Sequence, residues 1–333
     1  MPAVRTDVLG IGNAIVDVIA RAEDDFLVAQ GMRKGAMTLI DEQRAEAIYA
    51  AMGPASESSG GSAANTIVGV ASFGARAAFI GKVKDDGLGR AFAHDIRAAR
   101  VAFDAKPAPA GPSTARCYIM VTPDGERTMN TYLGAAQDLT PADIDEEAVA
   151  AAAVTYLEGY LWDPPQAKDA FVKAAEIAHQ AGRQVALTLS DAFCVDRYRA
   201  EFLDLIKTGT VDIVFANEHE LHSLYETADF DSALRALQSD ARLAAVTRSA
   251  KGCVVVSEEG LEAVNAVPVE QVADVTGAGD LFAAGFLVGL ARQQDLRDAA
   301  RLGALAASEV IQHMGARPAV SLKALAAENG LSV

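Results

Sequence analysis

The sequence has 333 residues, enough for two domains or for one large domain with an addition. It holds 29 Lys and Arg against 45 Asp and Glu, a net charge of −16, and 51% of its residues are hydrophobic. This composition predicts a large buried core and excludes a disordered acidic tail. The acidic balance also excludes nucleic acid and the membrane surface as expected partners, because both are bound through clustered Lys and Arg.

The N-terminus and the cysteines predict a cytoplasmic protein. Residues 1–10 lack the basic and apolar regions of a signal peptide, and no apolar run reaches the roughly 20 residues that span a bilayer. Cys117, Cys194 and Cys253 follow no CxxC spacing, which favours free thiols in a reducing compartment.

Short apolar runs alternate with Ala-rich helical stretches along most of the chain. The runs that predict strands are residues 8–12, 77–81, 154–158, 185–189, 211–215, 243–246 and 253–256. Thr140 followed by Pro141 is typical of a helix start, and Gly182 is placed to end a helix that begins near Pro165. The alternation predicts an α/β fold, a doubly wound and mostly parallel sheet flanked by helices. We expect its ligand site beyond the carboxyl ends of the strands.

Two segments break this alternation. Residues 15–40 hold an apolar run, a polar turn near Gln30 and a second apolar run. Residues 113–133 predict two strands joined by a Pro-Asp-Gly turn. Together they predict a small β-sheet that covers the site as a lid. The large domain is then expected to consist of residues 1–14, 41–112 and 134–333.

The strongest local signal is Asp274-Val-Thr-Gly-Ala-Gly-Asp280, which precedes an amphipathic run over residues 281–292. Gly277 and Gly279 allow close approach to the backbone, and N–H groups at a helix start form an anion site. A carboxylate repels phosphate, so Asp280 suits a base that takes a proton from an attacking hydroxyl. A plain helix cap is the alternative that this motif leaves open.

A second signal is Gly60-Gly-Ser-Ala-Ala-Asn65 at the start of an apolar helical stretch. The paired glycines admit a small polar ligand, and Asn65 lies about one helical turn further on, where its amide can bond that ligand. An ordinary Ser/Gly loop over residues 56–61 explains the same letters nearly as well.

Together these motifs resemble the ribokinase-like (pfkB) carbohydrate kinase family, and within it the adenosine kinases. The resemblance covers nearly the whole chain in the family's order, with the motifs at Gly60 and Asp274 as its two signatures. Further similar segments are Gly12-Asn13 with Asp17, residues 81–89, Asn217-Glu-His-Glu220, Thr247-Arg248 and Lys251-Gly252. The resemblance implies the α/β fold with a β-sheet lid, and ATP and Mg²⁺ as cofactors.

The resemblance also implies a reaction: transfer of the ATP γ-phosphoryl group to the 5′-hydroxymethyl of a nucleoside. Residues 113–117 and 126–136 are more similar to adenosine kinases than to ribokinases or fructokinases, which implies adenosine as the acceptor and a role in purine salvage. Met37, Leu39, Leu133 and Tyr160 are candidates for an apolar purine slot, with ordinary packing as the alternative.

The implied roles fall into four groups. Asp280 is the base, and the N–H groups of Gly277, Ala278 and Gly279 form the anion hole. The residues implied in substrate binding are Asn13, Asp17, Gly60, Gly61, Ser62, Asn65, Arg127 and Leu133. Those implied in nucleotide binding are Asn217, Thr247, Arg248, Gly252 and Gly279, and Glu220 is implied in Mg²⁺ binding through water.

Alternatives stay open. A free sugar of the ribose, fructose or 2-keto-3-deoxygluconate type would be phosphorylated by the same chemistry, and a non-catalytic member would bind a nucleotide or sugar only. Val275 stands where many family members have Thr, which leaves open a monovalent cation site, such as one for K⁺, beside this turn. The family implies a monomer or a homodimer joined through the lid, whose strand edges invite pairing.

Overall fold

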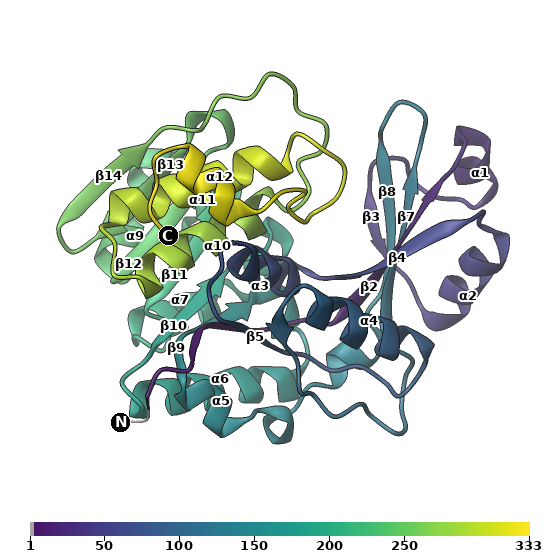
Figure 1. Ribbon diagram of the computed structural model, residues 1–333, viewed down its shortest axis with the longest axis horizontal. Helices are drawn as coiled ribbons and strands as arrows, with labels where there is room; N and C mark the ends of the chain where they lie inside the picture. The colour runs from purple at the N-terminus through teal and green to yellow at the C-terminus, as the bar shows by residue number, and fades with distance from the viewer. Residues whose placement is uncertain (1–2) are drawn as a thin grey trace.

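In a computed structural model that describes residues 3–333, the chain forms two β-sheets that lie side by side (Figure 1). The larger sheet has nine strands in the order β14-β13-β12-β11-β10-β9-β1-β5-β6. Their bounds are β1 Thr6–Ile11, β5 Ala77–Ile80, β6 Val101–Ala102, β9 Ala152–Glu158, β10 Gln184–Thr188, β11 Ile213–Asn217, β12 Leu243–Thr247, β13 Cys253–Ser257 and β14 Gly260–Val264.

The large sheet is parallel except at one edge. From the edge strand β6 across the sheet to β12, each strand pairs in parallel with its neighbour. Strand β13 then runs antiparallel to β12, and β14 runs antiparallel to β13. The predicted fold class is therefore confirmed. Some details differ: the strand predicted over residues 211–215 lies at 213–217, and the two edge strands β14 and β6 have no predicted counterpart.

Helices cover both faces of this sheet. One face carries α3 Ser62–Ser72, α4 Gly87–Ala98, α10 Ala278–Ala291, α11 Leu296–Val310 and α12 Leu322–Glu328. The other carries α5 Glu146–Ala150, α6 Pro165–Gln180, α7 Ala192–Lys207, α8 Glu218–Tyr225 and α9 Phe230–Asp240. Each face has its own apolar core, because neighbouring strand residues such as Val8 and Leu9 point to opposite sides.

Helix α10 differs from its prediction. The run over residues 281–292 was expected to be amphipathic, but every residue from Leu281 to Gly289 is buried. A helix that is apolar on all sides lies inside the protein. A side chain is impossible at Gly285, where a Cβ would lie 2.5 Å from the Gly303 nitrogen of α11. The N-terminus of α10 is thereby held at a fixed place.

The predicted helix ends are found where expected. Thr140 and Pro141 begin a short 3₁₀ turn, Pro141–Asp143, closed by a capping box. Helix α6 begins at Pro165, and Gly182 follows its end with φ 67°. In the described residues no helix is long and apolar enough to cross a membrane.

The smaller sheet has the strand order β3-β8-β7-β2-β4. Its strands are β2 Ile15–Arg21, β3 Met37–Leu39, β4 Ala55–Gly60, β7 Ala115–Val121 and β8 Arg127–Tyr132. Strands β7 and β8 form the predicted hairpin. Helices α1 Asp24–Ala29 and α2 Glu42–Ala51 lie on the outer side of this sheet (Figure 1), and its other face turns to the large domain.

The boundary predicted for the small sheet is wrong for residues 41–60. These residues were assigned to the large domain, yet α2 packs on the small sheet and β4 pairs antiparallel with β2. The sequence of β4, Ala-Ser-Glu-Ser-Ser-Gly, lacks the apolar alternation of a strand, so its conformation depends on the neighbouring strand. Helix α1 also occupies part of the segment where only a turn was expected.

Candidate active site

A cavity of about 1310 Å³ lies between the two sheets, at the carboxyl ends of the large sheet's strands. The chain leaves the central strand β1 toward β5 on one side and returns to β9 on the other, so the strand order reverses between β1 and β9. Ligands of open α/β sheets bind at such a reversal. The cavity brings together the predicted site residues, with Gly60 and Arg248 as the two exceptions.

Asp280 lies in the first turn of α10 and lines the cavity. Its carboxylate accepts hydrogen bonds from Ser62 Oγ at 2.6 Å and from Asn65 Nδ2 at 3.3 Å. Burial raises the pKa of Asp280 to about 6, which the charge of Asp17 reinforces and the two hydrogen bonds oppose. The side chain caps no N–H group of its own helix, so the geometry favours a base over a plain cap.

The turn before Asp280 requires glycine at Gly277. This residue has φ 80°, and a Cβ there would lie 2.7 Å from the Ala316 Cα. Gly279, by contrast, faces open space. The first turn of a helix directs N–H groups outward, and this end of α10, the predicted anion site, opens into the cavity.

Asn13 and Glu158 meet at the reversal between β1 and β9. Asn13 Nδ2 donates to Glu158 Oε1 at 2.7 Å, and the Ala63 N–H donates to Glu158 Oε2 at 2.9 Å. Burial raises the pKa of Glu158 to about 7 against these bonds. Sequence reasoning missed Glu158, although a carboxylate at the end of an apolar strand was a usable signal.

Asp17 is the carboxylate that the small sheet adds to the cavity. Burial raises its pKa to about 6, while the charges of Arg317 and Arg127 oppose the rise. Gly60 lies behind it, where a Cβ would be 2.4 Å from Asp17 Oδ2. Gly60 therefore makes room for a binding group and does not line the cavity itself. Gly61 has φ 99° and does line it.

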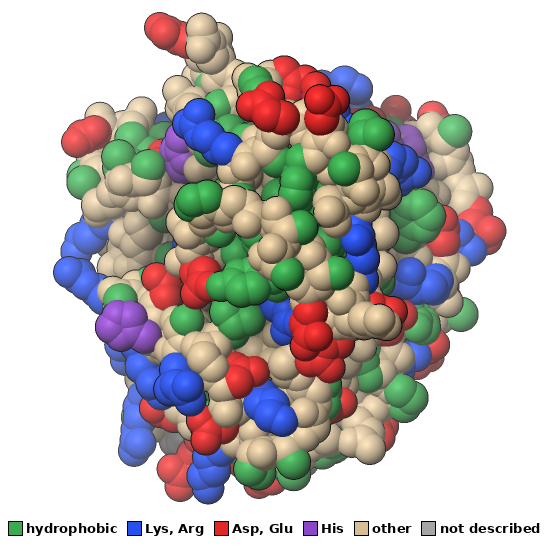
Figure 2. Space-filling view, turned by 90° about the vertical axis from the view of Figure 1, so that its right-hand side faces the viewer, with side chains coloured by type: hydrophobic (Ala, Val, Ile, Leu, Met, Phe, Trp, Pro, Cys, Tyr) green, Lys and Arg blue, Asp and Glu red, His purple; other side chains and the backbone are tan. Residues whose placement is uncertain are grey.

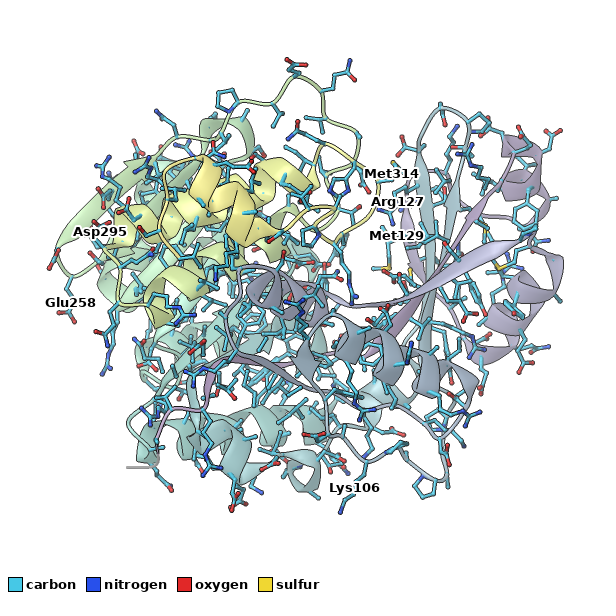
Figure 3. All side chains as sticks on the ribbon, in the orientation of Figure 1. Lys106, Arg127, Met129, Glu258, Asp295 and Met314 are labelled. Carbon is cyan, nitrogen blue, oxygen red and sulfur yellow. The ribbon has the colours of Figure 1, made fainter. Side chains whose placement is uncertain are left out.

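Arg127 connects the small sheet to the Asp274 turn. It forms an ion pair with Asp274 in which the two side chains are 9% and 6% exposed. Figure 3 shows Arg127 and Met129 directed from β8 toward the large domain and Met314. Asp274 also accepts from the N–H groups of Thr276 and Gly315, and these bonds with the Arg127 charge hold its pKa low although burial raises it.

The ion pair bears on the K⁺ site that the sequence left open beside this turn. The carboxylate of Asp274 already faces a cation of the chain itself, besides two N–H donors. A K⁺ ion bound to this carboxylate would have to displace a buried guanidinium, so the donor set does not fit such an ion.

The residues predicted to bind the nucleotide lie near the ends of β11 and β12. Asn217 caps α8, and Glu220 closes the capping box because its Oε2 accepts from the Asn217 N–H at 3.0 Å. Its Oε1 also accepts from Asn217 Nδ2 at 2.5 Å. Burial raises the pKa of Glu220 to about 7. Thr247 and Gly252 line the cavity; Gly252 has φ 83°, and a Cβ there would lie 2.0 Å from the Val264 oxygen.

Arg248 was predicted to bind the nucleotide, but the structure turns it away from the cavity. Its guanidinium pairs with Glu218 at 3.0 Å and lies 3.7 Å above the Phe230 ring. Both partners belong to helices α8 and α9, which pack behind the strand. The guanidinium of Arg248 therefore contacts these helices and not the cavity.

Residues 37–323 match the pfkB family carbohydrate kinases. The chain belongs to this family. It is 58% identical to the adenosine kinase from Sinorhizobium meliloti, with a TM-score of 0.91 over 98% of this chain and 99% of that one. A probable sugar kinase from Rhizobium etli CFN 42 is 54% identical, with a TM-score of 0.92 over 99% and 100%. Fructokinase-1 from Oryza sativa subsp. japonica is 32% identical over 68% of this chain and 72% of that protein.

This pfkB kinase is thus a phosphotransferase that acts on a hydroxyl group. Figure 2 shows the small-sheet side of the molecule, where acidic and basic side chains are interspersed. The charge of −16 does not gather into one patch on that face, so an anionic ligand depends on local groups at the cavity.

Apolar residues line the pfkB kinase cavity from both the small sheet and the large domain. The residues named for a purine slot all line it: Met37, Leu39, Leu133 and Tyr160. Tyr160 lies on the 3₁₀ turn Gly159–Trp162, in which Trp162 Nε1 donates to Glu201 at 2.8 Å. Sequence reasoning missed Ser190, which has φ 73° and accepts a bond from the Tyr160 N–H at 3.1 Å. Such a conformation is costly for a non-glycine residue and is common at functional sites.

Proposed function

We propose that this pfkB kinase is an adenosine kinase that transfers the γ-phosphoryl group of ATP to the 5′-hydroxyl of adenosine. The observation that carries the proposal is the position of Asp280. Its carboxylate lines one cavity together with the predicted anion site of α10 and apolar residues of the small sheet, where a purine would fit. The 58% identity to the Sinorhizobium meliloti adenosine kinase supports a nucleoside as the acceptor.

Asn13 and Asp17 suit the vicinal hydroxyls of a ribose. Asn13 is 1% exposed, and its Oδ1 has no hydrogen-bond partner within residues 3–333, so it can accept from a substrate hydroxyl. The carboxylate of Asp17 can accept two more hydrogen bonds. Bound in this way, the ribose would present its 5′-hydroxyl to Asp280.

Asp280 would take the proton of that hydroxyl as the oxygen attacks the γ-phosphorus. With a pKa of about 6, the carboxylate is mostly ionised at neutral pH and still a stronger base than an ordinary aspartate. The bonds from Ser62 and Asn65 hold it in place. The N–H groups of Gly277 and Gly279 would stabilise the charge on the transferring group, whereas the Ala278 N–H, also predicted for this role, already donates to the Val275 carbonyl at 3.2 Å.

Glu220 and Asn217 are the residues that we propose for Mg²⁺. Both oxygens of Glu220 already accept from Asn217, at 2.5 and 3.0 Å, which fits contact through water and not direct ligation. When bound, Mg²⁺ neutralises phosphate charge. Arg127 keeps a buried Nε without a partner in the described part of the chain, so it has a donor left for a ligand while paired with Asp274.

Substrate-dependent ADP release tests the assignment. The panel comprises adenosine, inosine, ribose, fructose and 2-keto-3-deoxygluconate, each with Mg²⁺ and ATP. We expect kcat/KM to be highest for adenosine. A clear preference for a free sugar would overturn the nucleoside assignment, and no turnover with any acceptor would favour a non-catalytic member.

A sugar kinase is the second candidate, and the relatives named as fructokinase and probable sugar kinase favour it. In that case the apolar residues of the small sheet only pack against one another. Substituting Met129→Ala separates the two candidates: it should weaken nucleoside binding and leave the binding of a small sugar unchanged.

We place this reaction in purine salvage, since it returns a free nucleoside to the nucleotide pool. The cytoplasm is the proposed location, supported by three buried and unpaired cysteines, Cys117, Cys194 and Cys253. Deletion of the gene should abolish incorporation of labelled adenosine into nucleotides in the cytosolic fraction, and unchanged incorporation would contradict both placements.

A further inference from the structure

Arg317 lies behind the cavity wall, in the loop that follows α11. Its side chain does not line the cavity and is 21% exposed. Its Nη1 donates to Asp95 Oδ2 at 3.0 Å and its Nη2 to Ser59 Oγ at 2.7 Å. Its Nε donates to Asn65 Oδ1 at 3.4 Å. One guanidinium thus joins α4, β4 of the small sheet and α3.

Asn65 is held between a group that only donates and a group that accepts. A guanidinium has no acceptor, and an ionised carboxylate has no donor. Arg317 on one side and Asp280 on the other therefore allow a single orientation of the Asn65 amide. The contact of 3.3 Å from Asn65 Nδ2 to Asp280 Oδ2 has this polarity. An amide turned by 180° would set its oxygen against the carboxylate and repel the anion.

The far side of Arg317 is anchored as well. Asp95 Oδ2 accepts from the Ser59 N–H at 2.8 Å and from Ser59 Oγ at 2.5 Å, besides its bond to Arg317. These bonds place the planar guanidinium in one position, which a flexible ammonium group would not reproduce.

We propose that Arg317 is a positioning residue for phosphoryl transfer, which fixes the Asn65 amide so that Asp280 is held in place as an anion. The inference rests on the proposed role of Asp280 as the base. Arg317 acts on Asp280 through Asn65 and does not itself line the cavity, and its charge also opposes the rise in the pKa of Asp17. The groups that face Asp280 are Asp17 from β2, Tyr156 and Glu158 from β9, Tyr160 from the following turn, and Ser62 and Asn65 from α3.

A double-mutant cycle between Arg317 and Asn65 tests the inference. The enzymes are wild type, Arg317→Gln, Asn65→Ala and the double variant, assayed with MgATP and acceptor from pH 5 to 9. We expect Arg317→Gln to lower kcat about tenfold or more and to move the acid limb of kcat/KM upward by roughly one pH unit. In the Asn65→Ala background the same substitution should change kcat less than about twofold. An equal loss in both backgrounds would overturn the inference.

Two further variants separate orientation from charge and from folding. Arg317→Lys keeps the charge without the planar fork, so normal kcat in this variant would contradict the role in orientation. Arg97→Gln is the matched control, because Arg97 on α4 donates to the Phe103 carbonyl at 2.9 and 2.5 Å, away from Asn65. The Arg97→Gln variant should leave the acid limb of the kcat/KM profile at the same pH as in wild type.

The carboxyl pKa of Asp280 gives a readout without turnover. In protein labelled with ¹³C at the aspartate carboxyls, the Asp280 signal is assigned by its loss in Asp280→Asn and titrated in wild type and Arg317→Gln. We expect a higher pKa in the variant, and an unchanged pKa would overturn the inference. If a sugar and not adenosine is the acceptor, the double-mutant cycle is run with that sugar. A wrong substrate assignment is thereby distinguished from a wrong role for Arg317.

Discussion

The two sheets contribute to the cavity in different ways. The large sheet and its helices supply Asp280, Glu158 and the anion site, each held by hydrogen bonds from buried elements. The small sheet supplies apolar side chains with Asp17 and Arg127 among them, and Met37 and Leu39 are 45% and 57% exposed. Under the proposed function, the base comes from the large domain, and the small sheet adds apolar and charged contacts for the acceptor.

Asp280→Asn removes the base and nothing else from the large-sheet side. We expect kcat to fall by about 10³-fold, because general-base catalysis contributes roughly 10²–10⁴ and the transferring group keeps its anion site. Acceptor binding, measured by calorimetry, should stay within about threefold of wild type. Turnover close to that of wild type would mean that Asp280 only closes the helix start.

Asp274→Asn breaks the connection between the two layers. The buried Arg127 charge would lose its partner, so we expect a loss of about 3 kcal/mol in the free energy of unfolding, measured with urea. The double variant Arg127→Met with Asp274→Asn removes both charges and should be more stable than Asp274→Asn alone. Additive losses would show that the two side chains do not act as a pair.

Met129→Ala tests whether the small sheet contributes to acceptor binding. This side chain lines the cavity from β8 beside Arg127. Removing it should raise KM for adenosine about tenfold with kcat nearly unchanged, the pattern of a contact made equally in the ground and transition states. Exposed Met314 lies outside the cavity lining, so Met314→Ala is the control, expected to keep the wild-type KM. A fall in kcat with KM unchanged would contradict the division between the layers.

The raised carboxyl pKa values make the free protein less stable as pH increases. Asp280 and Asp17 have pKa values near 6 when folded and lower values when unfolded, so the folded state binds more protons between about pH 4 and 6. Stability from these groups is present at low pH and lost as pH rises through 6. Asp280→Asn should therefore raise the stability of the free protein at pH 7.5 by roughly 1 kcal/mol and have little effect at pH 4.5. Thermal melts at both pH values check this, and an equal effect at each would contradict it.

The sequence allowed the large sheet and most of the cavity to be predicted, since both depend on local patterns. The apolar run at residues 154–158 forms a strand as its pattern predicts, and the turn at Gly277 needs its glycine because φ there is positive. Strand β4 could not be predicted, because its polar residues become a strand only beside β2. Arg248 contacts Glu218 and Phe230, which lie in helices that precede it in the chain. Arg317 reaches a residue 252 positions away, and no spacing in the sequence indicates that contact.

The 3₁₀ turn Gly159–Trp162 provides an optical probe within the protein. The sequence has one tryptophan, and it lies two residues from Tyr160 at the cavity. Trp162 is 4% exposed, bonded to Glu201, with Lys168 5.5 Å from its ring. Its emission comes from a single environment near the cavity, so under the proposed function stopped-flow fluorescence would follow acceptor binding in the unlabelled enzyme without interference from a second indole.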